Sequence, residues 1–133
     1  MIPRSLALAA FAALLSAAPV WAHHSHAMYD STAEIELEGV IKEVRWANPH
    51  VWLYLVVGNP DGTAKTWAFE GASIEQLRRK GWTLDSLSAG SPIKISCYPL
   101  RSGGPGCVGG YVLTLNGEAL PPTHERHAGR EFD

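Results

Sequence analysis

The 133-residue sequence has few cysteines, no excess of basic residues and a single long apolar run. It contains 2 cysteines, and its 11 lysines and arginines are set against 13 acidic residues, for a formal net charge of −2. Because no basic stripe runs along the chain, the sequence disfavours nucleic-acid binding. After residue 22 no apolar segment approaches the roughly 20 residues of a membrane-spanning helix, so no stable span is expected there.

Motifs of several enzyme classes are also missing. The chain has no G-x-S-x-G, no H-E-x-x-H and no glycine-rich phosphate loop leading into a helix. The glycines of residues 103–110 lie between two predicted strands, which is typical of a loop. The sequence therefore favours a protein that is not an enzyme, without deciding the question.

The long apolar run lies at the N-terminus. Arg4 precedes an alanine- and leucine-rich stretch over residues 6–20, and Val20-Trp21-Ala22 resembles a peptidase cleavage site. The alternative is a retained membrane anchor, for which the run is too short. We therefore expect a signal peptide at residues 1–22, cleaved after Ala22, and a periplasmic mature protein that begins at His23.

The cysteine pair favours a disulfide. Cys97 and Cys107 flank a turn-rich stretch of prolines and glycines, and an even pair in an exported protein is most simply bonded. Catalytic dithiols usually have the closer C-x-x-C spacing. In the chain-entropy account, closing so short a loop stabilises the fold by about 2–3 kcal/mol.

The mature chain has the apolar patterns of a mainly β protein. Strands are predicted at residues 34–46, 50–57, 63–70, 91–98 and 108–115. Gly39 stands where the apolar parity of the first strand changes, and we expect a bulge or a coil in a strongly bent strand there. The second strand is apolar at both parities, which predicts burial on both faces.

One short helix is predicted between the third and fourth strands. Ser73 and Gln76 form a capping-box pattern ahead of residues 74–80, and Gly81 stands at the C-terminal end. Three strands, a helix and two strands is the element order of a five-stranded OB-like barrel. A sandwich or an open sheet with one helix is the alternative.

These patterns divide the mature chain into three parts. A histidine-rich N-terminal segment covers residues 23–33, the OB-like barrel domain covers residues 34–120, and a polar C-terminal tail covers residues 121–133. The tail has few apolar residues, and we expect it to be mobile.

The histidines point to copper. His23, His24 and His26 cluster at the expected mature N-terminus, where a terminal histidine offers its α-amine and ring Nδ1. Together with another imidazole they form a three-nitrogen set suited to Cu(II). Trimming to His24 would place His26 third, an arrangement suited to Cu(II) or Ni(II). His50, before the second strand, is a further donor that the N-terminal segment is long enough to reach.

Other donors and surfaces are secondary. Met28 would add a soft ligand for Cu(I), whereas His124 and His127 lie in the expected tail. The alternative is that the histidines near the cleavage site are hydrophilic residues of the N-terminal segment and bind no metal. Trp52 and Trp67 form a candidate ligand face, with core packing as the alternative.

Several segments together resemble a known family. They are residues 23–25, 28–30, 43–52 with the motif N-P-H-V-W, 66–70 and 77–83. The chain resembles an uncharacterised bacterial family, domain of unknown function 6152. The resemblance implies an exported, periplasmic protein of Gram-negative bacteria and carries no activity. The cysteine pair departs from the family pattern.

Three functions follow as hypotheses. The first is a small periplasmic protein that binds copper through His23 and His24, supported by His26 and His50. The second is a metal-free OB-like module that binds a peptide, a glycan or a partner enzyme. The third is a copper-dependent redox enzyme. The expected partner is thus a metal ion or an unidentified periplasmic molecule.

Overall fold

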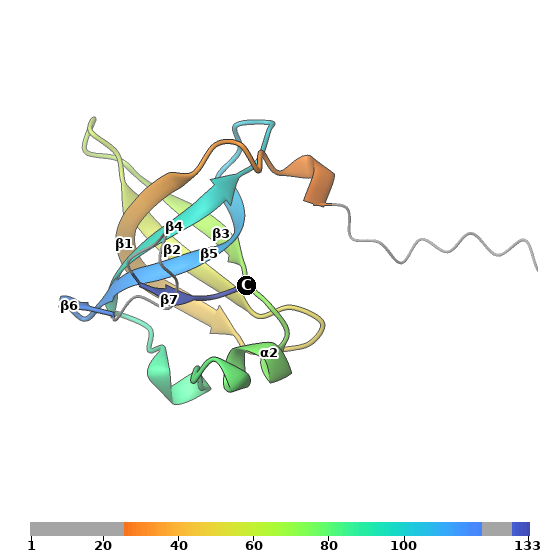
Figure 1. Cartoon of the computed structure of the whole chain (residues 1–133). Helices are drawn as coiled ribbons and strands as arrows, with labels where there is room; N and C mark the ends of the chain where they lie inside the picture. The colour runs from red at the N-terminus through yellow and green to blue at the C-terminus, as the bar shows by residue number, and fades with distance from the viewer. Residues whose placement is uncertain (1–25, 121–128) are drawn as a thin grey trace, which may run out of the picture.

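The computed structural model describes residues 26–120 and 129–133 (Figure 1). The expected signal peptide and the histidines at positions 23, 24, 124 and 127 lie outside the described residues. No helix in the described ranges is long and apolar enough to cross a membrane.

Five strands form the barrel: β1 (Ile35–Arg45), β2 (Trp52–Gly58), β3 (Ala64–Glu70), β4 (Pro92–Pro99) and β5 (Gly106–Leu115). They pair in the order β3-β2-β1-β4-β5, and β5 then pairs with β3 in parallel. The sheet therefore closes on itself, which gives β3 and β5 the partners that edge strands lack. This confirms the five-stranded OB-like barrel (Figure 1).

The core lies inside this closed sheet, where period-two alternation directs one apolar set inward. Leu53 and Leu55 of β2 and Ile93 and Ile95 of β4 are all buried. Phe69 of β3 completes this layer. The alternation thus confirms the strand assignments of β2, β3 and β4.

The helix α2 (Ile74–Arg79) covers one end of the barrel (Figure 1). Its N-terminus has the predicted capping box, in which Ser73 Oγ accepts from the backbone of Gln76 and the Gln76 side chain accepts from the backbone of Ser73. Leu77 points into the core and is fully buried. A short 3-10 helix, Leu84–Ser86, follows.

The bulge in β1 is not at the glycine. The register with β2 shifts between Ile41 and Glu43, two to four positions beyond Gly39. Gly39 is instead required by close strand packing, because a Cβ there would clash with the carbonyl oxygen of Val56. As a result the apolar parity changes later than predicted, and Val40 faces outward with 42% of its surface exposed.

The prediction that β2 is buried on both faces is wrong. Leu53 and Leu55 are buried, whereas Tyr54 is only half-buried and Val56 is exposed. A single closed sheet has one inner face, so the other parity of β2 faces outward. Apolar residues on such an outer face are common and do not indicate a second core.

The last five residues correct the expected polar tail. β7 (Arg130–Glu131) pairs with β5, and Phe132 is fully buried beside Phe69 and Trp82. A lone phenylalanine among polar residues has no periodicity, so no sequence pattern predicts its burial. β6 (Glu118–Ala119) pairs with the end of β5.

The expected disulfide is present. Cys97 of β4 and Cys107 of β5 are bonded, and both side chains are fully buried. The bond spans the base of the β4–β5 connection. The N-terminal segment packs against this same connection.

Candidate functional site

A pocket of about 370 Å³ opens between the N-terminal segment, the β1–β2 loop and the end of β3. Its lining includes His26, Tyr29, His50, Glu70, Tyr98 and Asp133. These residues come from widely separated parts of the sequence. The pocket is therefore a product of the barrel topology.

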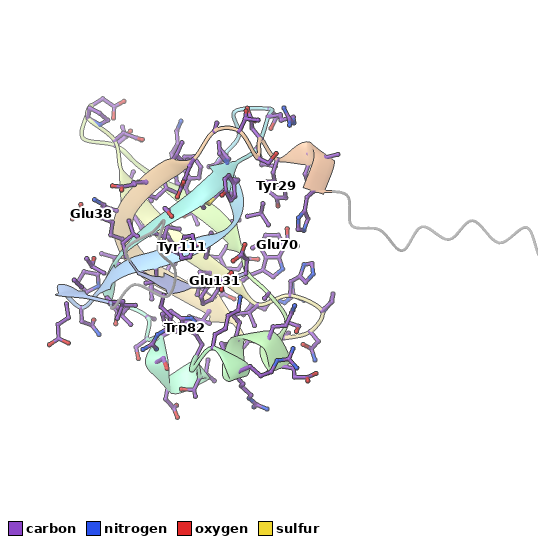
Figure 2. All side chains as sticks on the ribbon, in the orientation of Figure 1. Tyr29, Glu38, Glu70, Trp82, Tyr111 and Glu131 are labelled. Carbon is purple, nitrogen blue, oxygen red and sulfur yellow. A yellow bond between two sulfur atoms is a disulfide. The ribbon has the colours of Figure 1, made fainter. Side chains whose placement is uncertain are left out.

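Glu70, the last residue of β3, is at the centre of this site. Only 8% of its surface is exposed, although it is an acidic residue. One carboxylate oxygen accepts a hydrogen bond from the Tyr29 hydroxyl at 2.8 Å, and the other pairs with Nδ1 of His50. Figure 2 shows Tyr29 and Glu70 on the side of the barrel nearest the N-terminal turn. These two contacts offset the cost of burying the carboxylate.

Tyr29 is fixed by the way the N-terminal segment docks onto the barrel. A single 3-10 turn, His26–Met28, precedes it, and Tyr29 forms an isolated β-bridge with Leu100. The backbone N–H of Arg101 donates to the Met28 carbonyl at 2.9 Å. Because these bonds hold the turn, the hydroxyl of Tyr29 reaches Glu70.

The environment of Tyr29 keeps its hydroxyl protonated. Burial raises the pKa of the Tyr29 phenol well above its usual range, and the hydrogen bond to Glu70 and the charge of Glu70 raise it further. The phenol is consequently a hydrogen-bond donor at any physiological pH. Tyr29 thus holds one oxygen of Glu70 while the other oxygen contacts His50.

His50 lies in the loop just before β2, and the backbone of its neighbour fixes the loop. The N–H of Val51 donates to the Ala72 carbonyl at 2.9 Å, and the N–H of Gly71 donates to the Val51 carbonyl at 2.8 Å. Metal-ligating histidines commonly have one ring nitrogen on a carboxylate, which orients the other toward the metal. The Nδ1 contact of His50 with Glu70 has this arrangement.

His26 lines the same pocket as His50, so the structure brings two of the four predicted histidine donors to one site. Its ring meets the ring of Tyr29 edge-on, with centroids 6.4 Å apart. Within residues 26–120 and 129–133, no three histidine, cysteine or acidic side chains are grouped closely enough to hold a metal ion. A three-nitrogen site therefore needs donors from before His26, where His23 and His24 precede it in sequence.

The two tryptophans do not form one ligand face. Trp67 is paired with the buried Leu55 and packs against the core, whereas Trp52 is paired with Glu70 on the other side of the sheet. Directly opposed residues on paired strands share a face, so the register separates Trp52 from Trp67. The candidate face of Trp52 and Trp67 is corrected accordingly.

A second pocket, of about 390 Å³, also borders His50, Glu70 and Tyr29. Its lining adds Met28, Arg45 and Trp52. The Tyr29–Glu70–His50 group therefore contributes to two pockets. His26 lines the first and Met28 the second.

Three site residues were missed from the sequence. Tyr29 and Glu70 are 41 positions apart, and no spacing rule connects them. Asp133 lies in the expected tail, yet it lines the first pocket, where burial raises the pKa of its carboxyl group. The one available signal was that residues 28–30 and 66–70 both belong to the segments that carry the family resemblance.

Comparison with known proteins gives a family and nothing more specific. No curated protein and no solved structure matches the chain. The sequence model described as "Family of unknown function (DUF6152)" matches residues 11–109, a range that includes Tyr29, His50 and Glu70. Since the match covers well over half of the sequence, the chain belongs to the DUF6152 family.

Proposed function

We propose that this protein is an exported, periplasmic copper-binding protein that holds Cu(II) through its mature N-terminus and His50. His23 supplies the α-amine and a ring nitrogen, and His24 and His26 are the neighbouring imidazoles. The observation that carries the proposal is the pairing of His50 with the buried Glu70 in a pocket that His26 also lines.

The chemistry of the donors favours copper. Imidazole and amine nitrogens bind Cu(II) more tightly than the other divalent first-row metals. A carboxylate on Nδ1 makes an imidazole a stronger ligand and fixes its orientation. Glu70 has this role for His50, and Tyr29 holds Glu70 in turn.

The charge of the pocket agrees with a cationic ligand. Glu70 and Asp133 line it, and no lysine or arginine does so among the described residues. Acidic groups in a partly enclosed site raise the local concentration of cations. A divalent ion is therefore a better occupant than an anion.

The test is a Cu(II) titration of the mature protein that begins at His23, followed by calorimetry and electron paramagnetic resonance. One matched control carries a single extra N-terminal residue, which removes the α-amine from His23. A second comparison sets His50→Gln beside His127→Gln. We expect tight one-to-one binding with a nitrogen-rich spectrum, weakened by the extra residue and by H50Q but unchanged in H127Q.

Equal binding in the protein with the extra residue would reject the N-terminal site. Equal binding in H50Q would remove His50 from it. Should no specific copper binding be found, the pocket volume of about 370 Å³, which lies within the range of small-ligand sites, favours the metal-free binding module. Turnover of oxygen or peroxide by the copper-loaded protein would instead indicate the redox enzyme.

A further inference from the structure

We infer an alternative copper site, selective for Cu(I), in the pocket formed by Met28, His50 and Trp52. Because Nδ1 of His50 pairs with Glu70, the imidazole can give only one ring nitrogen to a metal, so Cu(I) here and Cu(II) at the first pocket exclude each other. The inference rests on the proposed copper function and adds the oxidation state that this pocket selects. It concerns the second pocket, of about 390 Å³, on the Met28 side of the Tyr29–Glu70–His50 group.

The N-terminal turn places a nitrogen ligand at one pocket and a sulfur ligand at the other. His26, at the start of the 3-10 turn, lines the first pocket, and Met28, at its end, lines the second. Tyr29 follows directly and borders both, with its hydroxyl on Glu70. Nitrogen donors are therefore available on one side and a thioether on the other.

Met28 is the most exposed of the large apolar side chains in the described ranges. With 57% of its surface exposed, it gains little from burial, although its backbone is held firmly. The Met28 carbonyl accepts from the Arg101 backbone, and the Ala27 carbonyl accepts from the Arg101 side chain. A fixed backbone beneath an exposed thioether is suited to presenting the sulfur to a ligand.

Trp52 adds an aromatic surface to this pocket. It lies directly opposite Glu70 in the β2–β3 pairing, on the same face of the sheet, and its side chain is half-buried. The face of an indole ring attracts cations. Met28, His50 and Trp52 thus offer a thioether, an imidazole and an indole to one ion.

The charge and softness of the pocket select the monovalent ion. Glu70 and Arg45 are the charged residues that line it, and their opposite charges largely cancel. Such a pocket attracts a divalent cation less than the first pocket, where no arginine opposes the carboxylates. Thioether sulfur is a soft donor that prefers Cu(I).

The sequence makes this site simple to detect. Of the 2 methionines, one is Met1, and the 2 cysteines are bonded to each other and buried. In the oxidised mature protein, a copper–sulfur distance in X-ray absorption therefore identifies Met28.

The experiment uses anaerobic Cu(I) with a chromophoric chelator as competitor, and X-ray absorption of the loaded protein. The protein carries the extra N-terminal residue, so that the proposed Cu(II) site is disabled. We expect one Cu(I) with a sulfur neighbour. Since losing even an outer partner weakens metal binding about 10–100-fold, Met28→Leu should weaken Cu(I) binding at least about tenfold and abolish the sulfur signal.

The matched control moves the thioether elsewhere. In M28L combined with Leu84→Met, an exposed methionine stands on the 3-10 helix Leu84–Ser86, which lines neither pocket, and Cu(I) binding should stay weak. Cu(I) binding without a sulfur neighbour, or unchanged binding in M28L, would overturn the Cu(I) site. If the protein with the extra N-terminal residue loses Cu(II) binding but keeps sulfur-bound Cu(I), the Cu(I) site is distinguished from the proposed Cu(II) site.

Discussion

Glu70 is the residue on which the organisation of the site depends. Its buried carboxylate receives the Tyr29 hydroxyl on one oxygen and His50 on the other. A buried carboxylate without such partners would cost several kcal/mol of stability, of the order found when one member of a buried ion pair is removed. The contacts that make this burial tolerable also fix the imidazole of His50.

Replacing Glu70 with glutamine tests this role directly. The amide keeps the shape of the side chain but removes the charge next to His50, so we expect Glu70→Gln to weaken Cu(II) binding about 10–100-fold. Competition titration measures the affinity, and the paramagnetic resonance spectrum shows whether the ligand geometry changes.

Glu75→Gln is the control for this change, because Glu75 is exposed on α2 and pairs only with Arg79 among the described contacts. It should leave copper affinity unchanged. If E70Q and E75Q bound copper equally well, Glu70 would have no part in orienting a ligand.

For individual residues, the sequence predicts the candidate metal donors but not the residues that hold those donors in place. His26 and His50 are recognisable because an imidazole is a metal ligand wherever it occurs. Glu70 and Tyr29 have no such signal, since their meeting depends on the docking of the N-terminal turn against the β4–β5 connection. That contact is tertiary, and no local pattern predicts it.

Among the secondary-structure elements, we expect β7 and the following Phe132 to contribute most to the stability of the fold for their length. The Trp82 side chain donates to the Glu131 carbonyl at 2.9 Å, and the Arg130 guanidinium lies 4.9 Å from the centre of the Trp82 ring. Phe132 then fills the core beside Trp82. A Cβ on Gly71 would clash with the Phe132 ring, so the loop after β3 is shaped to receive it.

Truncating this side chain should be severe. A fully buried phenylalanine replaced by alanine typically costs about 3–5 kcal/mol, and we expect Phe132→Ala to lower the free energy of unfolding by this amount. Urea denaturation measures it. Leu84→Ala, at a side chain that is 49% exposed, is the control and should change stability by less than about 1 kcal/mol. A loss in F132A as small as that of the control would show that the C-terminal residues do not belong to the barrel.

The elements that the sequence predicted are those with local physical signals. The capping box at Ser73 and the alternation in β4 depend on neighbouring residues, and both are confirmed. The sequence predicts the bulge of β1 at the wrong residue, because a glycine occurs inside a strand for two different reasons. It marks either a change of register or the close approach of another backbone. In Gly39 the second cause applies.

For the molecule as a whole, Asp133 links stability to pH. Burial, and to a lesser extent the charge of Glu131, raise the pKa of its carboxyl group, and together they outweigh the lowering by the Gly110 N–H and the charge of Lys80. The folded state therefore holds this proton more tightly than the unfolded state. Its contribution to stability is complete below the ordinary pKa of an aspartate and is lost as the pH rises through the raised value.

Asp133→Asn removes this titration. We expect the free energy of unfolding of the natural protein, relative to that of D133N, to fall as the pH is raised from about 3.5 to about 7. Urea denaturation at several pH values measures the difference, in which the titrations common to both proteins cancel. A difference that does not vary with pH, or that rises with it, would contradict a raised pKa at Asp133.

The whole fold was predictable because the order of elements restricts the topology. Three strands, a capped helix and two strands suffice to suggest the barrel, and the closure of β5 on β3 confirms it. The shape of the site was not predictable in the same way. It is formed where residues 26–29, the β1–β2 loop and residue 133 meet, and these segments are joined only by the finished barrel.

The parallel seam between β3 and β5 has a consequence for the time course of folding. It joins Ala68 to Gly106 and Phe69 to Cys107, so a long stretch of chain must be ordered before the barrel can close. Non-local pairings of this kind make all-β domains fold in milliseconds to seconds. Cys107 lies in the seam and is tethered to Cys97 of β4, which pairs with β1. When the disulfide has formed, it holds the Cys107 end of β5 next to β4. The chain then loses less conformational entropy when β5 pairs with β3 and closes the barrel.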